Sequence, residues 1–505
     1  MSEGSPGREE PFDIVVVGGG GAGLMAALAA ARLGRRVLLL EKNPELGGTT
    51  RLSVGTICTT ATAEQQALGI LDTPDGHFED MAKFAGDLVA RDNPALRRLL
   101  VDEVPETYRQ LKEAGIVFMG PIPEPPHRHP RLHAILPHSR GYVHHLAKAC
   151  RRAGAELRTG CRVARLLQDG GRVGGVEATR EGGAVLTIRA RQAVILAAGD
   201  FSSADRGFKA RFLAPELLDV EGANPTSTGD GQRLGEAAGG EVVNGDLVWG
   251  PEIRFLAPPQ PALVNRLPPW RTAARAIGLA MAVLPEKLLR PFLMSFATTL
   301  LAPSPGLFAA GAILVNKAGR RFCDERDRPQ DRISREADGV SYLVLDAAIA
   351  EKFAAWPGYV STAPGVGYAY LKDYLRSRRD ITFQAETVEG LAAAMGVDAA
   401  ALARTLADYN ASPERGARPA LTRPPYFALG PAKSWIMFGE GGLRVDARLR
   451  VLDAERQPIA GLYAAGSCGQ GGLILNGHGH HLGWAFTSGR LAGQNAALGE
   501  ALQGD

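Results

Sequence analysis

A glycine-rich turn between two apolar runs constrains this chain more than any other stretch. Residues 13–41 read DIVVVGGGGAGLMAALAAARLGRRVLLLE: an apolar strand, a glycine turn, an alanine-rich helix, a second buried strand and an acid. Gly18 allows the tight turn, Gly20 lets the backbone approach a pyrophosphate, and Gly23 lets helix and strand pack closely. The pyrophosphate then lies at the positive end of the helix, and Glu41 stands where an acid accepts hydrogen bonds from an adenosine ribose. The stretch predicts an α/β fold with a Rossmann-like, dinucleotide-binding domain.

Composition is that of an ordinary globular enzyme. The 505 residues suggest two or three domains, and a formal charge of +3 is too small for this length to indicate binding to nucleic acid. The five cysteines are scattered without a CxxC pair, which argues against a disulfide framework, an iron–sulfur cluster or a zinc site. Residues 1–11 are polar and acidic and carry no secretory or twin-arginine signal. We therefore expect a cytoplasmic protein.

Several segments resemble one flavoprotein superfamily. Glu41-Lys42, then Gly47-Gly48-Thr49-Thr50, then Ser53-Val54-Gly55-Thr56 resemble the FAD-dependent fumarate reductase and 3-ketosteroid dehydrogenase superfamily. The resemblance covers most of the chain, through AVILAAG at 193–199, GAILVNKAGRRFCDE at 311–325 and NGHGHHLGWAFTSG at 476–489. It implies that the cofactor is FAD. Covalent-flavin members carry a histidine shortly after the Gly-Gly loop; since Arg51, Leu52 and Ser53 stand there, we expect noncovalent FAD.

The resemblance also implies a domain plan. An FAD-binding domain of the GR2 flavoprotein type would comprise residues 1–247 and 437–505, with an inserted α+β capping domain at 248–436. The N-terminal amides of the closing helix should face flavin N1 and O2, where partial positive charge suits the reduced ring. The glycine turn and the resemblance together give these FAD-binding residues: Gly18, Gly20, Gly21, Ala22, Gly23, Glu41, Lys42, Gly48, Thr49, Thr50, Gly55, Thr56, Val163, Ala198, Gly199, Asp230, Gly466, Ser467, His481 and Leu482.

Histidines concentrate in one proline-rich stretch, so a metal site has to be considered. Six of the ten histidines lie between residues 127 and 145. Metal ligands need rigid, convergent placement, and nothing in the sequence fixes such a geometry. We therefore predict no metal site. The stretch 127–130, His-Arg-His-Pro, resembles a family loop that borders the substrate cavity, so its histidines or Arg131 are expected to touch substrate.

Most of the dicarboxylate clamp of a fumarate-type reductase is missing. The family's first cap histidine is matched by the stretch 248–251, Val-Trp-Gly-Pro, and its second by 437–440, Met-Phe-Gly-Glu. The carboxylate-binding arginine of the closing segment is matched by about Asn476. The proton-donating arginine has only Arg328 near its position, one residue early. We therefore expect a substrate other than fumarate or succinate.

The closing segment resembles the ketosteroid dehydrogenase branch more closely, through glycines at 477, 479 and 483. Such enzymes remove two hydrogens beside a ketone: a base takes the α-proton, a donor polarises the carbonyl, and the β-hydride goes to flavin N5. The branch's tyrosine is absent, because Arg328 and Pro329 stand at its position. The candidate catalytic residues are Arg328, His129, His478 and His480.

Residues 267–311 form an unusually apolar insertion, with no charged residue from Pro291 to Asn316. That length would suit a spanning helix, but Pro303-Ser304-Pro305-Gly306 interrupts it. Trp270, Phe292 and Phe296, with Arg271, Arg275, Lys287 and Arg290 nearby, suit an amphipathic element at a membrane interface. A buried lid or an oligomer contact is the alternative. Either reading indicates an apolar substrate, and the first a peripheral location on the inner face of the membrane.

Three functions follow from these patterns. The leading one is an FAD-dependent dehydrogenase that forms a carbon–carbon double bond beside a ketone in a hydrophobic, steroid-like substrate. The second is an ene-reductase of fumarate-reductase type acting on an unsaturated carbonyl or carboxylate. The third is a membrane-docked electron-transfer flavoprotein subunit. The first requires an external electron acceptor, and none involves nucleic acid.

Overall fold

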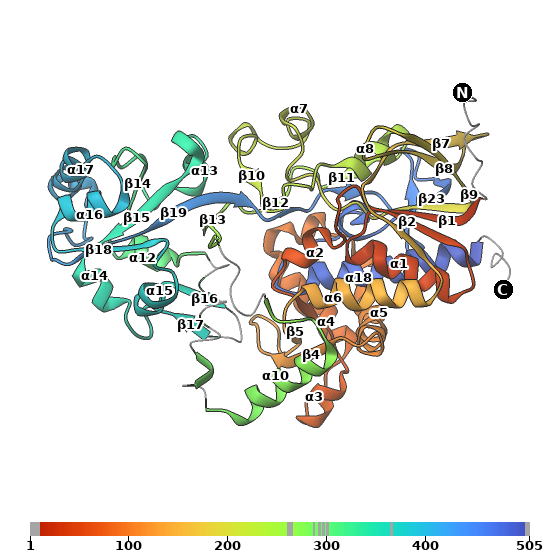
Figure 1. Ribbon diagram of the computed structural model, residues 1–505, viewed down its shortest axis with the longest axis horizontal. Helices are drawn as coiled ribbons and strands as arrows, with labels where there is room; N and C mark the ends of the chain where they lie inside the picture. The colour runs from red at the N-terminus through yellow and green to blue at the C-terminus, as the bar shows by residue number, and fades with distance from the viewer. Residues whose placement is uncertain are drawn as a thin grey trace.

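A mainly parallel sheet built on the glycine turn lies at the upper right of the right-hand lobe in Figure 1. The computed structural model describes residues 11–259, 266–285, 288–290, 294, 298, 302–363 and 367–499. The strand order is β22-β23-β9-β1-β2-β6, and β1 pairs in parallel with both β2 and β9. The strands are β1 (Phe12–Val17), β2 (Val37–Leu40), β6 (Glu156–Arg158), β9 (Val185–Leu196), β22 (Arg450–Leu452) and β23 (Pro458–Ala464).

Two long helices from opposite ends of the chain pack together against this sheet. They are α1 (Gly21–Arg32) and α18 (His480–Leu498). A Cβ atom at Gly489 would lie 2.2 Å from the backbone oxygen of Ala22, so α18 approaches α1 closely enough to require glycine. Helix α6 (Arg140–Arg152) lies beside α1 in Figure 1. The core of this lobe is therefore assembled from residues near both termini.

A β-meander and a small sheet complete this lobe. Strands β7 (Cys161–Asp169) and β8 (Arg172–Arg180) pair antiparallel with each other, and β8 pairs with β9. The small sheet has the order β3-β5-β4. Its strands are β3 (Thr56–Cys58), β4 (Val117–Ile122) and β5 (Leu132–Leu136). The helices of this part of the chain are α2 (Gly48–Leu52), α3 (Ala63–Ala67), α4 (Pro74–Ala85), η1 (Gly86–Arg91) and α5 (Pro94–Glu113).

The left-hand lobe contains a second sheet with its own hydrophobic core. Its strands are β10 (Glu221–Gly222), β13 (Glu252–Phe255), β14 (Ile313–Val315), β15 (Ser341–Leu345), β18 (Thr382–Ala385) and β19 (Tyr426–Ile436). Its helices are α12 (Pro305–Ala309), α13 (Gln330–Ile333), α14 (Ala347–Lys352), α15 (Leu371–Ser377), α16 (Val388–Met395) and α17 (Ala399–Ala411), with the hairpin β16 (Ser361–Ala363) and β17 (Gly367–Ala369). The mixture of strands and helices gives the α/β class predicted for the whole chain.

Short strand pairs lie where the two lobes meet. Strand β12 (Val248–Trp249) pairs antiparallel with β20 (Phe438–Gly439), and β11 (Val242–Val243) with β21 (Gly442–Leu443). The expected boundaries at 247/248 and 436/437 fall at the start of β12 and the end of β19, although β10 of the preceding segment also joins the left-hand sheet. Helices α7 (Arg206–Lys209) and α8 (Asp230–Ala237) lie above this junction in Figure 1.

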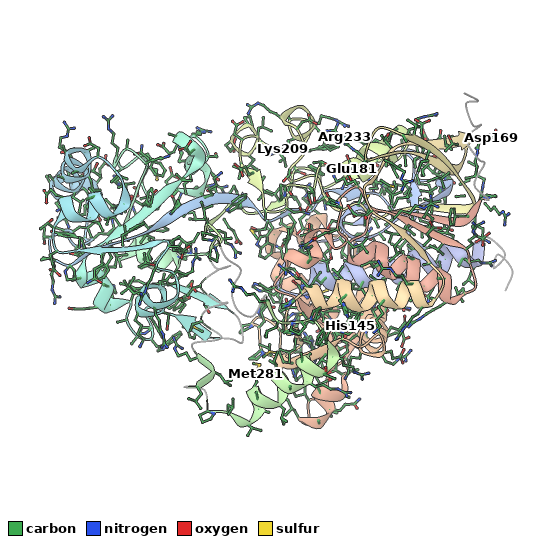
Figure 2. All side chains as sticks on the ribbon, viewed as in Figure 1. His145, Asp169, Glu181, Lys209, Arg233 and Met281 are labelled. Atoms are coloured by element: carbon green, nitrogen blue, oxygen red, sulfur yellow. The ribbon has the colours of Figure 1, made fainter. Side chains whose placement is uncertain are left out.

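Near its end the apolar insertion contributes α12, and before it the longer helix α10 (Arg271–Val283). Helix α10 lies along the lower edge of the molecule, where Met281 is labelled in Figure 2, and contacts β4 and β5. Within the described part of the chain, no helix is long and apolar enough to cross a bilayer. Residues 286–287, 291–293, 295–297 and 299–301 lie outside the described residues, so the expectations for Lys287, Phe292 and Phe296 do too.

Candidate functional site

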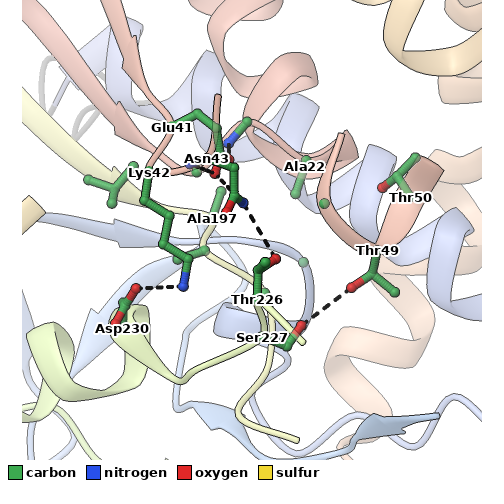
Figure 3. A pocket seen from close by; sticks show the side chains of 18 of the residues that line it. Ala22, Glu41, Lys42, Asn43, Thr49, Thr50, Ala197, Thr226, Ser227 and Asp230 are labelled. Atoms are coloured by element: carbon green, nitrogen blue, oxygen red, sulfur yellow. Dashed lines mark hydrogen bonds and ion pairs between the residues drawn. The ribbon is translucent and has the colours of Figure 1, made fainter. Parts of the chain in front are cut away.

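A pocket opens at the carboxyl ends of β1, β2 and β9, where parallel α/β sheets place their ligand sites. Figure 3 shows it from close by. It is lined by Val17, Gly18, Gly19, Gly20, Gly21, Ala22, Leu40, Glu41, Lys42, Asn43, Gly48, Thr49, Thr50, Cys161, Arg162, Val163, Ala197, Ala198, Gly199, Asn224, Thr226, Ser227, Asp230, Ala465, Gly466, Ser467 and Ala485. Segments from both ends of the chain therefore build one site.

The glycines of the turn have different surroundings. Gly18 has φ +108°, and a Cβ there would lie 2.4 Å from the backbone oxygen of Ala197. A Cβ at Gly23 would lie 1.9 Å from the backbone oxygen of Gly18, so Gly23 serves close packing within the turn. At Gly20 the nearest atom to a Cβ would be the oxygen of Gly47 at 3.9 Å, so Gly20 faces open space. A phosphate group can approach the backbone at Gly20 and nowhere else in this trio.

The carboxylate of Glu41 holds the turn and the next loop together. Its Oε2 accepts a hydrogen bond from the backbone N–H of Gly19 at 2.7 Å. Its Oε1 accepts from the backbone N–H and the side-chain amide of Asn43, at 2.9 and 2.8 Å. Since a carboxylate offers about four lone-pair directions, one remains for a ligand hydroxyl.

An ion pair crosses the pocket next to Glu41. The Lys42 ammonium donates to Asp230 Oδ2 at 2.8 Å and to the hydroxyl of Thr228 at 2.5 Å, and Figure 3 shows the contact with Asp230. Arg162 donates to the other oxygen of Asp230 at 2.7 Å. Burial by itself raises the pKa of Asp230, but the hydrogen bonds from Lys42 and Arg162 outweigh it and lower that pKa below its usual value.

Most residues predicted to bind the cofactor line this pocket. The exceptions are Gly23, Gly55, Thr56, His481 and Leu482. The predicted closing helix begins at His480, later than its expected start at Asn476, so Asn476 to Gly479 form a loop before it.

Several pocket residues were not predicted from the sequence, among them Asn43, Asn224, Thr226 and Ser227. Asn43 donates to the hydroxyl of Thr226 at 3.4 Å, and Thr49 lies 3.4 Å from Ser227 across the pocket (Figure 3). The signal that could have identified three of them is the run of turn-forming residues Asn-Pro-Thr-Ser-Thr-Gly at 224–229, directly before Asp230.

The structure does not bring the four catalytic candidates together. The Arg328 side chain is 65% exposed, pairs with Asp331 at 2.5 Å and lies just before α13 in the other lobe. His129 is half-buried in the loop between β4 and β5. Only His478 and His480 are close in sequence, at the start of α18.

These two histidines have opposite environments. The His478 ring is 45% exposed, and its Nδ1 pairs with the carboxylate of Glu124. His480 is fully buried: its Nδ1 lies 2.6 Å from the backbone oxygen of Asn476 and its Nε2 lies 3.2 Å from Nε2 of His77. His478 is therefore accessible to a ligand, whereas both ring nitrogens of His480 face protein groups.

A buried cluster of one cysteine and three histidines surrounds His480. Its members are Cys58, His77, His127 and His480, and Cys58 Sγ lies 3.6 Å from His127 Nε2. Burial and neighbouring positive charges lower the pKa of His127 to about 2, and burial lowers that of His480 to about 4. Burial also raises the pKa of the Cys58 thiol and lowers that of His77. All three imidazoles are therefore neutral at pH 7. His127 and His480 were each expected near the substrate, but no pattern in the sequence groups these four residues.

Aromatic side chains and one acid meet at the junction of the lobes. The rings of Trp249 and Phe438 are 5.7 Å apart, and those of Phe438 and His481 are 3.8 Å apart. His481 Nε2 lies 3.2 Å from the buried carboxyl group of Glu440. This cluster adjoins the pocket, because the Gly439 backbone N–H donates to Asp200, directly after pocket residue Gly199. The stretches matched to the family's two cap histidines therefore carry aromatic side chains and a buried acid in this chain.

Comparisons with known proteins agree on the cofactor domain. The family model described as FAD binding domain matches residues 13–261 and 274–477. A probable fumarate reductase from Shewanella frigidimarina (strain NCIMB 400) is 26% identical over 518 residues, which cover 97% of this chain and 76% of that protein.

Solved structures extend the similarity to both lobes. The open conformation of a flavocytochrome c3 fumarate reductase matches with a TM-score of 0.72 and 25% identity, covering 97% of this chain and 79% of that one. The 3-ketosteroid-Δ4-(5α)-dehydrogenase from Rhodococcus jostii RHA1 matches with a TM-score of 0.60 and 25% identity, covering 97% and 98%. Both branches of the superfamily that the sequence resembles are therefore represented.

Proposed function

The chain belongs to the FAD binding domain family, and on this premise we propose that it is a dehydrogenase that forms a carbon–carbon double bond beside the ketone of a hydrophobic substrate. The general class is established: the chain is an FAD-dependent oxidoreductase acting on CH–CH groups, as are its relatives. The proposal concerns the substrate class and the direction of the reaction.

The pocket offers protein contacts for two parts of FAD, its diphosphate and a ribose hydroxyl. Open space at Gly20 and the N-terminus of α1 accommodate the diphosphate, and the free acceptor capacity of Glu41 suits a ribose hydroxyl. When bound, FAD supplies the hydride acceptor for the reaction. The protein has to orient the substrate, exclude water and take up the proton.

The proposal of an uncharged, ring-shaped substrate rests on the aromatic side chains at the junction of the lobes, Trp249 and Phe438. By the family resemblance, a reductase that clamps two carboxylates carries histidines in the stretches matched by 248–251 and 437–440, where this chain has Trp249 and Phe438 and no histidine. The buried Glu440 next to them would repel a carboxylate, since like charges in a low-dielectric site are costly. Flat aromatic faces instead favour burial of a cyclic hydrocarbon.

Of the four catalytic candidates, His478 best suits the role of base. Its ring is partly exposed and pairs with a carboxylate, an arrangement that orients an imidazole. His480 has no free ring nitrogen, and Arg328 is exposed and paired in the other lobe. His129 also remains a candidate, because it lies in the loop between β4 and β5 that contributes Glu124, the partner of His478.

An ene-reductase on the same fold is the second candidate, because the sequence relative and one structural neighbour named above are fumarate reductases. It would run the reverse reaction on an unsaturated carbonyl compound. The aromatic junction again favours an uncharged substrate over fumarate.

Anaerobic flavin spectroscopy separates these functions. Saturated cyclic ketones and steroids are added to the oxidised protein, and enones or fumarate are added after photoreduction. Bleaching by a ketone without reoxidation by fumarate is the expected result. Rapid reoxidation by fumarate would refute the proposal, and reoxidation by enones alone, without bleaching by ketones, would favour the second candidate.

A pair of variants tests the proposed base. His478→Gln should slow ketone-dependent bleaching about 10²-fold or more while FAD loading is unchanged. His144→Gln, which alters an exposed histidine on α6, is the control and should leave the rate unchanged. An unaltered rate in His478→Gln would remove His478 from the mechanism.

We also propose that the exposed face of α10 rests on a membrane surface. Leu279 is 67% exposed and Val283 71% exposed, and Trp270 at the start of the helix is 58% exposed. Arg271 and Arg275 are exposed on the same helix. An apolar face flanked by cations and a tryptophan suits an interface with anionic lipids.

Vesicle sedimentation tests this contact. The protein should sediment with anionic vesicles, and Leu279→Glu together with Val283→Glu should abolish that binding. Val185→Glu, at a residue 60% exposed on β9, provides a matched control that should still bind. Equal sedimentation of all three proteins, or none for the wild type, would show that α10 does not bind lipid.

A further inference from the structure

A second cavity lies in the left-hand lobe and shares no residue with the cofactor pocket. It has a volume of about 390 Å³ and lies between α12, α14 and the segment that follows η4 (Pro413–Arg415), in the part of Figure 1 where α12 and α14 are labelled. Since a water molecule occupies about 30 Å³ in the liquid, the cavity has room for roughly a dozen water-sized groups. A ligand that fills it is therefore larger than a bare phosphate or carboxylate.

The lining of this cavity combines positive charge with small apolar side chains. Its charged members are all cations: Arg326, Lys352, Arg415 and Arg418. The other lining residues are four alanines, Ile349 and Pro419, and no acid is among them. A ligand in this cavity would therefore meet several positive charges together with apolar surface.

Arg418 is the buried member of the four, with 7% of its surface exposed. Among the described residues its one ion pair is with Glu325, and this pair is long, at 3.5 Å from Nη1 to Oε2. The same carboxylate already accepts two hydrogen bonds of 2.9 Å from Arg321. The other bonds of Arg418 run to the backbone oxygens of Arg415 and Glu414, at 3.1 and 3.4 Å. Because a guanidinium group has five N–H donors, Arg418 keeps donors for a ligand and carries a charge that is only partly compensated.

Two of the other cations have no acid partner in the described part of the chain. Arg415 donates from Nη1 to the backbone oxygen of Arg418, and its buried Nε has no hydrogen-bond partner there. Lys352 is exposed at the end of α14 and forms no ion pair with a described residue. Only Arg326 has a close acid, Asp324 at 2.5 Å. The cavity therefore holds positive charge, and one buried N–H group, that the protein itself leaves unmatched.

Three further acids belong to the elements around the cavity, and each has other contacts. Asp346, buried at the start of α14, accepts hydrogen bonds from four backbone N–H groups. Glu351 pairs with Arg423 on the surface. Glu414 is exposed and acts on Arg326. None of the three lines the cavity, so none takes the place of an anion inside it.

Water alone accounts for only part of this arrangement. Solvent can hydrate Lys352 and Arg326, which are exposed. It does not account for the burial of Arg418 beside an acid that another arginine holds, since a buried charge is costly without a counter-charge. Arginine side chains suit an anion here, because the planar guanidinium group donates two parallel hydrogen bonds to a phosphate or a carboxylate.

We propose that this cavity binds a small organic anion. Its phosphate or carboxylate group accepts hydrogen bonds from Arg415, Arg418 and Lys352, and its apolar body lies against Ile349 and the neighbouring alanines. The site is separate from the FAD pocket, so it does not depend on the proposed dehydrogenase reaction.

Calorimetric titration of the full-length, FAD-loaded protein at constant ionic strength tests the proposal. The probes are phenyl phosphate with inorganic phosphate, benzoate with acetate, and the uncharged benzyl alcohol. At least one aromatic anion should bind about tenfold or more tightly than its bare anion, because a phenyl ring is buried with it, and benzyl alcohol should not bind. The pair that shows this difference identifies the anionic group. Failure of both aromatic anions to bind, or equal binding of each aromatic anion and its bare anion, would overturn the proposal.

Variants connect the binding to this cavity. Arg415→Gln and Lys352→Gln should each weaken binding of the aromatic anion about tenfold or more, because each removes a hydrogen bond between charged groups. Arg423→Gln, which removes an exposed cation outside the cavity, should bind within about twofold of the wild type. Flavin absorbance and circular dichroism report whether each variant is folded. Unchanged affinity in Arg415→Gln or, should that variant not fold, in the exposed variant Lys352→Gln would place the anion elsewhere and refute the assignment.

Discussion

Replacing Glu41 by glutamine should weaken FAD binding through the loop that the carboxylate supports. Glu41 accepts three hydrogen bonds, one on Oε2 from Gly19 and two on Oε1 from Asn43. Glutamine has one oxygen and one NH₂ group, so one end of its amide must face a donor. The less costly orientation keeps both bonds from Asn43 and leaves the Gly19 N–H without an acceptor.

The size of the effect follows from that lost bond. A hydrogen bond to a charged group contributes about 1.5–3 kcal/mol, and a buried donor without a partner costs a similar amount. Because these two figures describe the same loss, we take about 2–3 kcal/mol rather than their sum. At about 1.4 kcal/mol per tenfold change, the Kd for FAD should rise about 30- to 150-fold.

Titration of the apoprotein with FAD, followed by flavin fluorescence, measures this change directly. Glu45→Gln is the control, because Glu45 is 68% exposed in the same loop and pairs only with the surface residue Arg51 among described residues. The control should bind FAD within about twofold of the wild type, as expected for an exposed ion pair. A change of less than about threefold in Glu41→Gln would refute the reasoning, because it would mean that the Gly19 N–H has another acceptor.

Three further predictions concern the same domain. Gly23→Ala should lower the free energy of unfolding by about 3 kcal/mol, and with it the Tm and the yield of FAD-loaded protein, because the new methyl group would lie 1.9 Å from the Gly18 oxygen. Gly174→Ala, at a position in open space, should change neither the Tm nor the yield. The pKa of Asp230 is lowered in the folded protein, so its carboxylate stabilises the fold above the unfolded pKa, and that stability is lost as pH falls through the folded value. Lys42→Met should raise this pKa and move the acid limb of a Tm–pH profile to higher pH, in the range below about pH 4, the unfolded value of an Asp carboxyl. Exposed Lys148→Met should leave the limb unchanged, and coincident profiles of the two variants would contradict the ion-pair argument. Denaturation and ultrafiltration should release all flavin into the filtrate, and yellow protein retained on the filter would disprove noncovalent binding.

Local patterns were sufficient to predict the cofactor domain. The turn from Gly18 to Gly23, the two flanking strands and Glu41 lie within one stretch of sequence. Each of these features depends on its own backbone conformation and burial, and not on contacts with distant segments. The parallel pairing of β1 with β2 then follows, because parallel strands joined by a helix pack in few ways. The cofactor residues predicted from this stretch, apart from Gly23, line the pocket.

Positions that depend on distant contacts could not be predicted in this way. His77 and Cys58 meet His127 and His480 only after α4, β3 and α18 have packed together. The sequence gives no sign of this cluster, because its four members share no short spacing along the chain. His480 was proposed as catalytic from its place near the flavin, but its burial and both of its contacts direct it into the cluster.

The two ends of the chain are coupled through α18. Gly489 and Gly493 let this helix lie directly on α1, since a Cβ at either position would come within 2.2 Å of a backbone oxygen of α1. Ala485 lines the FAD pocket, and His480, at the start of the same helix, belongs to the cysteine–histidine cluster. A shift at the cluster would therefore be carried along one rigid helix to the pocket wall and to the helix that begins at the phosphate turn. FAD affinity and the integrity of the cluster should consequently change together, even though no residue of the cluster lines the pocket.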